Sequence, residues 1–234
     1  GVAVPDGAFI SPERSGLTLC DATSAAFVVD LPWDRLDVTT FSWQKVLGSE
    51  AAHGVLILSP RAVQRLQTHT PSWPIPKIFR LAKNGHPIEG IFSGATINTP
   101  SMLCVEDVLH SLHWARDQGG VAGLGQRAAD NVAMIDAFVS RNDWIEHLAV
   151  DPATRSPTSV CLRIRPPEHD SDQSAAIAKL MTTRLAEMGV AYDIGSYRAA
   201  PPGLRIWCGA TVETADIAAL LPWIEYAYHD ALSA

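Results

Sequence analysis

A lysine and an aspartate, twenty-four positions apart, are the two residues of this sequence that most clearly could take part in catalysis. Lys45 lies in the segment SWQKVLG at residues 42–48, and Asp21 lies in LTLCDATS at residues 17–24. A lysine in an apolar context can form a Schiff base with an aldehyde, and a carboxylate at the end of an apolar run can pair with a protonated pyridine nitrogen. Pyridoxal 5′-phosphate (PLP) chemistry needs both groups, so the pair predicts a PLP site.

Each member of this pair also has an ordinary structural explanation. An isolated lysine after an aromatic residue is usually solvated, and an aspartate after a strand often only caps a turn or a helix. What favours chemistry is that Ser42, Gln44 and Lys45 place hydroxyl, amide and amine groups in one turn, where they could converge on one ligand. A desolvated lysine has a lowered pKa, so its neutral amine can act as a nucleophile and then carry a proton.

Short apolar runs indicate the elements that would position these residues. The expected strands are 16–20, 37–42, 54–59, 158–164 and 203–208. One helix is expected to start at residue 61, and four others are expected at 101–118, 121–141, 173–188 and 213–229. The first two strands place Asp21 and Lys45 just past carboxyl ends, where open α/β sheets bind ligands. Their nearly continuous apolar character suits a sheet covered on both faces. Residues 67–100 are expected to be irregular, with a tight turn at Asn84-Gly85.

The order of these elements predicts an α/β chain in two parts. Residues 1–125 would form part of a larger domain, in which helices pack on a mostly parallel sheet. Residues 126–234 would form a small α+β domain, because strands and helices there follow each other with period-two and helical patterns in turn.

Composition and charge narrow the range of partners. With 47% hydrophobic residues the 234-residue chain can bury a sizeable core, and its net charge is 18 − 25 = −7. Without a long basic run, neither nucleic acid nor an anionic membrane is an expected partner, and no run approaches the roughly 18 apolar residues of a membrane span. The chain has four cysteines without Cys-x-x-Cys spacing: Cys20, Cys104, Cys161 and Cys208. We therefore expect reduced thiols, which fit a cytoplasmic protein, and we expect no metal site.

A longer segment around the lysine resembles a known family. The sequence SWQKVLGSEAAHGVLILSP at residues 42–60 is similar to phosphoserine aminotransferase, a fold-type-I PLP-dependent enzyme. Three further segments agree with this family in order and spacing: CDATSA at 20–25, INTPS at 97–101 and GLRIWCGATVE at 203–213. The resemblance covers essentially the whole chain. It implies the later part of the family's large domain, followed by the small carboxyl-terminal domain.

The resemblance also implies cofactor roles for particular residues. Lys45 would be the Schiff-base lysine, Asp21 the partner of the pyridine nitrogen, and Gln44 a ligand of the cofactor phosphate. Asn98 and Thr99 resemble residues that the family sends across a dimer interface to the neighbouring subunit's cofactor phosphate, which implies a homodimer with active sites at the interface. The alternative for Asn98 and Thr99 is an ordinary helix N-terminus, which is itself a natural phosphate site.

Two arginines match substrate-binding positions of the family. Arg205 would clamp the substrate α-carboxylate, and a bidentate guanidinium suits a planar carboxylate. Arg198 would contact the substrate's phosphate or side-chain carboxylate. Tyr197 precedes Arg198 where many family members have His, which leaves the role of this pair open. His53 could touch the cofactor, although packing within its loop is favoured.

The implied reaction converts 3-phosphohydroxypyruvate and glutamate to O-phosphoserine and 2-oxoglutarate, in serine biosynthesis. The family's subunits are considerably longer, and this chain opens with GVAVPDG and no initiator Met, so we expect a carboxyl-terminal portion. Such a portion would lack the family's ring-stacking aromatic residue and its Gly/Ser/Thr phosphate-binding turn. Two alternatives follow: an inactive truncated remnant that only dimerises or binds an anion, or a related PLP aminotransferase for another small amino acid.

Overall fold

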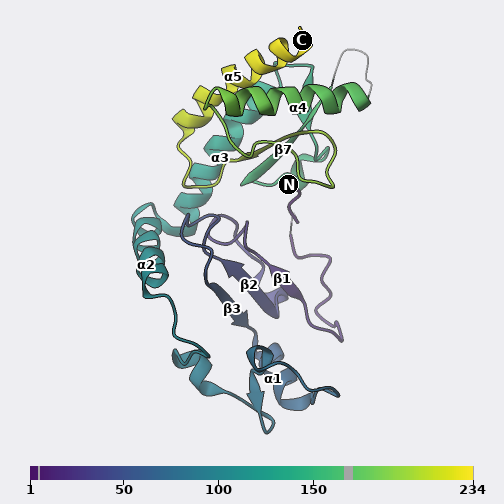
Figure 1. The fold of residues 1–234 in the computed structure, drawn as a ribbon. Coiled ribbons are helices and arrows are strands. Elements are labelled where there is room, and N and C mark those ends of the chain that lie inside the picture. Colours follow the sequence, from purple (N-terminus) through teal and green to yellow (C-terminus); the bar gives the residue numbers. More distant parts are fainter. Residues whose placement is uncertain (5, 166–170, 234) are drawn as a thin grey trace. The chain divides into compact units, whose positions relative to one another are not determined.

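Contacts within the chain divide it into two compact units. A computed structural model describes residues 1–4, 6–165 and 171–233 (Figure 1). Unit 1 consists of Gly1–Pro5, Phe27–Asp30 and Ala115–Ala234, and unit 2 consists of Asp6–Ala26 and Leu31–Trp114. The domain ranges expected from the sequence, 1–125 and 126–234, stay a prediction.

Unit 2 contains a three-stranded sheet in the order β1-β2-β3. Its strands are β1 (Leu19–Asp21), β2 (Val38–Ser42) and β3 (Gly54–Leu58). β1 and β2 are parallel, whereas β2 and β3 are antiparallel. Alternation in β2 buries Thr39 and Phe41 on one face, as a period-two strand requires.

The prediction that both faces of this sheet are buried is wrong for β3. Leu56 and Ile57, neighbours that point to opposite faces, are both exposed to solvent in the described part of the chain. A run of apolar residues indicates that a strand can be buried on both sides. It does not supply the elements that would bury it.

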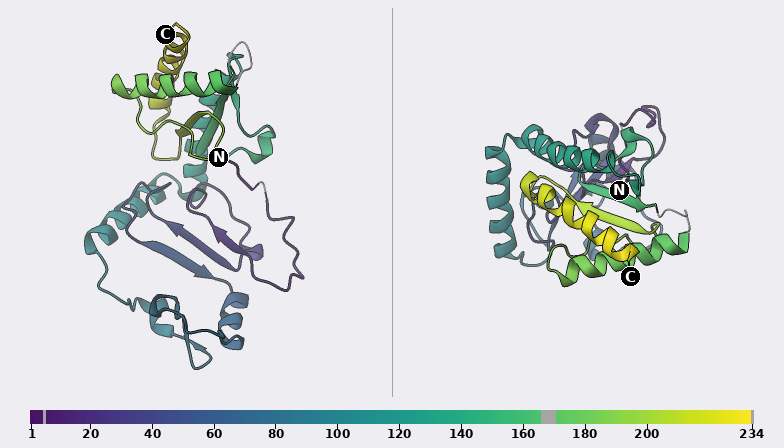
Figure 2. Two further views of the ribbon diagram at one scale, coloured as in Figure 1. Left: turned by 45° about the vertical axis from the view of Figure 1, so that its right-hand side comes forward. Right: turned by 90° about the horizontal axis from the view of Figure 1, so that it is seen from above.

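A helix and a hairpin follow the sheet in unit 2. α1 (Pro60–Thr68) begins after Ser59, whose Oγ accepts a hydrogen bond from the backbone N–H of Ala62 at 3.1 Å. Asn84 and Gly85 have positive φ of 52° and 76°, which confirms the tight turn and forms a two-residue hairpin. This hairpin, absent from our expectation for 67–100, lies beside α1 (Figure 2). The remaining elements are η1 (Trp33–Arg35), η2 (Lys77–Phe79), β4 (Ala82–Lys83), β5 (His86–Pro87), η3 (Glu89–Ser93) and α2 (Met102–Asp117). The last three residues of α2 belong to unit 1.

Unit 1 is an antiparallel sheet packed against helices (Figure 1). Its elements are α3 (Gly120–Val139), β6 (Ile145–His147), η4 (Pro152–Thr154), β7 (Ser159–Ile164), α4 (Ser171–Glu187), β8 (Gly203–Trp207) and α5 (Thr214–Leu232). β6 was not among the expected strands, because three residues carry too short a pattern to detect. None of the helices in the described ranges is long and apolar enough to cross a lipid bilayer.

Alternation along β8 decides where Arg205 points. Leu204 and Ile206 are buried in the core with residues of β7, α4 and α5. Arg205 lies between them and is therefore directed to the opposite face of the sheet, where it is half-buried. The core of unit 1 thus fixes the position of Arg205, a residue that could bind a substrate.

Candidate active site

Parallel pairing brings the two predicted cofactor residues to the same edge of the unit 2 sheet. Asp21 is the last residue of β1 and lies opposite Thr40 of β2, and the N–H of Ala22 donates to the carbonyl of Thr40 at 2.8 Å. β2 ends at Ser42, and Lys45 follows in the next turn. Because carboxyl ends of parallel strands meet at one edge, Asp21 and Lys45 leave the sheet on the same side.

The Asp21 carboxylate is suited to face a cation. Its Oδ1 accepts hydrogen bonds from Oγ1 and the backbone N–H of Thr23, at 2.5 and 3.0 Å. These bonds lower the pKa of Asp21, and slight burial opposes them only weakly. Both bonds end on Oδ1, so among the described residues Oδ2 is left for a ligand. A carboxylate that stays ionised with one oxygen open fits a protonated pyridine nitrogen.

The turn that carries Lys45 is closed by backbone hydrogen bonds. The N–H of Gly48 donates to the carbonyl of Lys45 at 3.2 Å, and the N–H of Ser49 donates to the carbonyl of Trp43 at 3.1 Å. Gly48 has a φ of 66°, a conformation that glycine adopts without strain. Lys45 is half-buried and Gln44 is exposed, so two predicted cofactor ligands share one defined turn.

A histidine links this turn to the segment with Asn98 and Thr99. The ring of His53 packs edge-on against Trp43, with centroids 5.5 Å apart, and its Nε2 accepts a hydrogen bond from the N–H of Ser101 at 3.2 Å. These are packing contacts, which agree with the role favoured for His53 from the sequence. Asn98 and Thr99 are exposed just before Ser101, so they lie on the segment that His53 ties to the lysine turn.

The middle of α2 is anchored to the same loop. Ser49 Oγ and Ser111 Oγ are 2.7 Å apart, and the N–H of Glu50 donates to Asp107 Oδ2 at 2.9 Å. Sequence reasoning did not identify these contacts, because the partners are about sixty residues apart and share no motif. They hold the loop after Lys45 against a helix.

The substrate-binding residues predicted from the sequence belong to unit 1. Arg205 Nη2 donates to Asp193 Oδ2 at 2.9 Å, and its guanidinium lies 5.8 Å from the centre of the Tyr197 ring. Arg198 is exposed and makes no hydrogen bond or ion pair with the described residues. Asp193 could not be identified from the sequence, since an aspartate in a loop twelve residues before Arg205 carries no spacing signal.

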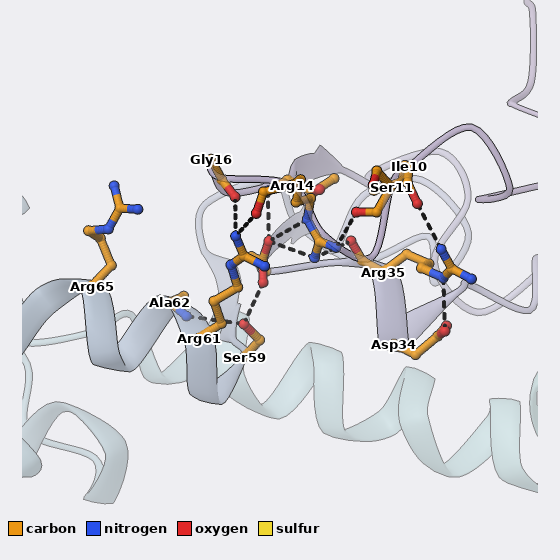
Figure 3. Close-up of polar contacts among 12 residues, drawn as sticks. Ile10, Ser11, Arg14, Gly16, Asp34, Arg35, Ser59, Arg61, Ala62 and Arg65 are labelled. Carbon is orange, nitrogen blue, oxygen red and sulfur yellow. Dashed lines mark hydrogen bonds and ion pairs between the residues drawn. The ribbon is translucent and has the colours of Figure 1, made fainter.

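A second polar cluster lies at the other end of β2 (Figure 3). The buried Asp37 accepts hydrogen bonds from Arg14 at 2.8 Å, from Ser59 Oγ at 2.9 Å and from the N–H of Thr18 at 2.8 Å. Burial by itself would raise the pKa of Asp37, but these bonds and the Arg14 charge outweigh it and lower the pKa. Asp37 is therefore an ionised anchor between loop, strand and helix.

A cavity of about 420 Å³ on α1 belongs to this end of the sheet. It is lined by Arg61, Gln64, Arg65 and Thr68. β3 runs antiparallel to β2, so α1 starts at the strand ends opposite to those that carry Asp21 and Lys45. Arg61 donates to the carbonyls of Arg14 and Gly16 (Figure 3). Arg65 donates to the carbonyl of Ser15 at 3.2 Å. These arginines fasten the 14–16 loop and are not part of the predicted cofactor site.

Comparison with known proteins decides the relationship. No family model matches the chain. The phosphoserine aminotransferase of Methanosarcina barkeri is 57% identical over 229 residues, which cover 98% of this chain and 60% of that protein. The phosphoserine aminotransferase of Methanosarcina mazei is 57% identical over 228 residues. The chain is homologous to phosphoserine aminotransferases. The resemblance predicted from the residues around Lys45 is thereby confirmed.

Solved structures show the same relationship at the level of the fold. The crystal structure of a phosphoserine aminotransferase from Cytophaga hutchinsonii matches with a TM-score of 0.77 at 17% identity, over 97% of this chain and 60% of that one. An alanine–glyoxylate aminotransferase from Nostoc sp. matches with a TM-score of 0.69 at 20% identity, over 90% of this chain and 53% of that one. These matches confirm the predicted fold class. The chain spans about 60% of the length of its phosphoserine aminotransferase relatives and corresponds to their carboxyl-terminal portion.

Proposed function

We propose that this chain carries Lys45, Asp21 and the substrate arginine of a PLP-dependent phosphoserine aminotransferase. The reaction would move an amino group between glutamate and 3-phosphohydroxypyruvate, giving 2-oxoglutarate and O-phosphoserine, as a step of cytoplasmic serine biosynthesis. The observation that carries the proposal is the shared sheet edge of Asp21 and Lys45, in a chain 57% identical to phosphoserine aminotransferases.

The two residues at this edge would divide the chemistry of the amino group. When bound, PLP supplies an electron sink that takes up the electron pair left on the substrate Cα after its proton is removed. Lys45 would hold the cofactor through its aldehyde, and its amine would take the proton from the substrate Cα. Asp21, ionised and hydrogen-bonded by Thr23, would keep the ring nitrogen protonated. Gln44, in the lysine turn, would donate to the cofactor phosphate.

Arg205 and Arg198 would select and orient the substrate. The Arg205 fork would hold the α-carboxylate in one plane, which aligns the Cα–H bond for proton removal. Arg198, exposed and without a partner in the described part of the chain, would meet the substrate's phosphate or side-chain carboxylate.

We also propose a homodimer in which Asn98 and Thr99 reach the neighbouring subunit's cofactor phosphate. Both side chains are exposed, and the segment is held by the bond from Ser101 to His53. A complementation assay tests this: a subunit with Asn98→Ala and Thr99→Val, mixed with a Lys45→Ala subunit, should regain activity that neither has alone. No recovery would contradict the shared site.

Chemical labelling tests the central proposal. The protein, produced at the full length encoded by its gene, is incubated with PLP and reduced with borohydride. The masses of its proteolytic peptides are then measured by mass spectrometry. Lys45 should carry the reduced cofactor, and Lys45→Ala should lose the label and at least about 10²-fold in transamination rate. Lys83→Ala, which removes an exposed hairpin lysine, should keep both. An unmodified Lys45 contradicts the proposal.

Two other functions are alternatives. The first is a remnant without turnover that only dimerises or binds an anion, and measurable transamination by this 234-residue chain would exclude it. The alanine–glyoxylate aminotransferase shares the fold, so activity on another small amino acid is the second. A substrate panel with a preference for an unphosphorylated acceptor would favour the second function.

A further inference from the structure

The guanidinium of Arg205 already holds a carboxylate. Its Nη2 lies 2.9 Å from Asp193 Oδ2, and the side chain of Arg205 is 28% exposed whereas that of Asp193 is 92% exposed. An ion pair with one fully solvated member is weak, because water rehydrates the released carboxylate at little cost. The pair is therefore exchangeable.

The surroundings of Arg205 leave its in-plane edge as the place where a carboxylate binds. The Cζ atom of Arg205 lies over the Tyr197 ring, 5.8 Å from its centroid, in a cation–π contact. Carboxylates bind a guanidinium in its plane, along the fork of N–H groups. Asp193 uses that edge. An incoming substrate carboxylate would need the same donors.

The backbone holds Asp193 close to this edge. Ile194 is buried, and its carbonyl accepts a hydrogen bond from the N–H of Arg205 at 2.8 Å. Asp193 itself has a φ of 50°, in the left-handed region that aspartate and asparagine tolerate better than most residues. The pair thus forms from a fixed backbone, and only the side chain of Asp193 has to turn away.

We propose that Asp193 is a competing carboxylate, which occupies Arg205 until the α-carboxylate of an amino or keto acid displaces it. The inference rests on the proposed substrate role of Arg205. Asp193 touches no reacting atom and acts only through Arg205, so it is a residue that sets affinity. Its presence lowers the apparent affinity for every ligand that binds Arg205 through a carboxylate.

Calorimetric titration of the full-length protein with glutarate tests this proposal. Asp193→Asn keeps the left-handed backbone, removes the charge and should tighten glutarate binding by about two- to five-fold, the range expected for an exposed ion pair. The KM for glutamate should fall by the same factor. In an Arg205→Ala background, the same substitution should change nothing. Asp117→Asn, which breaks an exposed pair with Arg116, is the matched control and should leave glutarate binding unchanged.

Each result decides the matter. Tighter binding in Asp193→Asn that depends on Arg205 supports the proposal. Unchanged or weaker binding, an equal gain in Asp117→Asn, or no glutarate binding in either protein overturns it. Borohydride labelling of Lys45 in the same samples reports separately on the proposed function. A labelled Lys45 with an unresponsive Asp193→Asn rejects only the competition, and an unlabelled Lys45 rejects the aminotransferase.

Discussion

The two units are stabilised in different ways. Unit 1 has a continuous apolar core that includes Ile135, Met181, Leu185, Leu204 and Ile224. Unit 2 exposes large apolar side chains, including those of Leu19, Leu56, Trp73, Phe79 and Leu103, and its sheet is anchored by the ionised Asp37. The proposed carboxylate-binding arginine therefore rests on a continuous apolar core, whereas the proposed cofactor residues lie on a three-stranded sheet that polar contacts also hold in place.

The largest stability effect should come from a cavity in the core of unit 1. Leu185 is 0% exposed, so Leu185→Ala should lower the free energy of unfolding of this unit by about 3–5 kcal/mol. Leu56, at 48% exposed in unit 2, is the matched control, and Leu56→Ala should cost less than about 1 kcal/mol. Hydrogen exchange of amides in β8 and β2 measures the two units separately. Equal losses would refute the contrast between them.

The next largest effect should be in unit 2, at its buried carboxylate. Asp37→Asn leaves the 16% exposed guanidinium of Arg14 without its charge partner, so we expect a loss of about 3 kcal/mol in the protection of β2 amides. Asp34 forms an exposed ion pair with Arg35, so Asp34→Asn should cost less than about 1 kcal/mol. If Asp37→Asn weakened β8 as much as β2, the polar anchor would not be specific to unit 2.

A buried amide in unit 1 should have a somewhat smaller effect. The Nδ2 of Asn131 donates to the carbonyls of Cys208 and Val212 at 3.1 and 2.9 Å, and its Oδ1 accepts from Thr214 Oγ1 at 2.8 Å. Asn131→Ala leaves these groups unpaired and should cost about 2 kcal/mol in thermal unfolding of unit 1. The neighbouring Asp130→Asn should be nearly silent. A silent Asn131→Ala would show that the core alone holds α3.

The smallest expected effect separates the units by pH. Burial and the Arg155 charge lower the pKa of His147, although Asp136 at 2.7 Å acts in the opposite direction. His147 then binds a proton more readily in the unfolded chain than in the folded one. Unit 1 should therefore lose stability as the pH falls below the ordinary histidine pKa of about 6.5. Asp37 also has a lowered pKa, so its contribution to unit 2 should be lost only below about pH 3.9. Protection of β7 and β2 amides between pH 8 and pH 4.5 measures both, and His147→Gln should flatten only the β7 profile.

Much of the fold could be predicted because its elements have clear periodic signals. The helices at 101–118 and 213–229 appear as Met102–Asp117 and Thr214–Leu232, and the strand at 203–208 appears as Gly203–Trp207. The short strand β6 and the hairpin β4–β5 were missed, because two or three residues do not establish a period. The antiparallel direction of β3 also lay beyond the sequence pattern, since alternation carries no information on strand direction.

The site was predictable to the extent that its residues follow strand ends. Lys45 and Asp21 could be named because a motif surrounds each of them. Asp193 and Asp37 could not, because the contacts that define them join positions twelve and twenty-three residues from their arginine partners. Such long-range pairs depend on strand register and loop path rather than on local spacing.

The sequence alone was enough to establish the similarity to phosphoserine aminotransferases, the alternation that turns Arg205 away from the core, and the types of residue available for the proposed PLP chemistry. The tertiary structure decided which of these residues share a sheet edge and which charges they meet. Parallel pairing of β1 with β2 brings Asp21 and Lys45 to one side, and the backbone bond from Arg205 to Ile194 puts Asp193 on the arginine's fork. The physical reason is that residue type and period act locally, whereas hydrogen bonding between distant strands and loops sets the remaining distances.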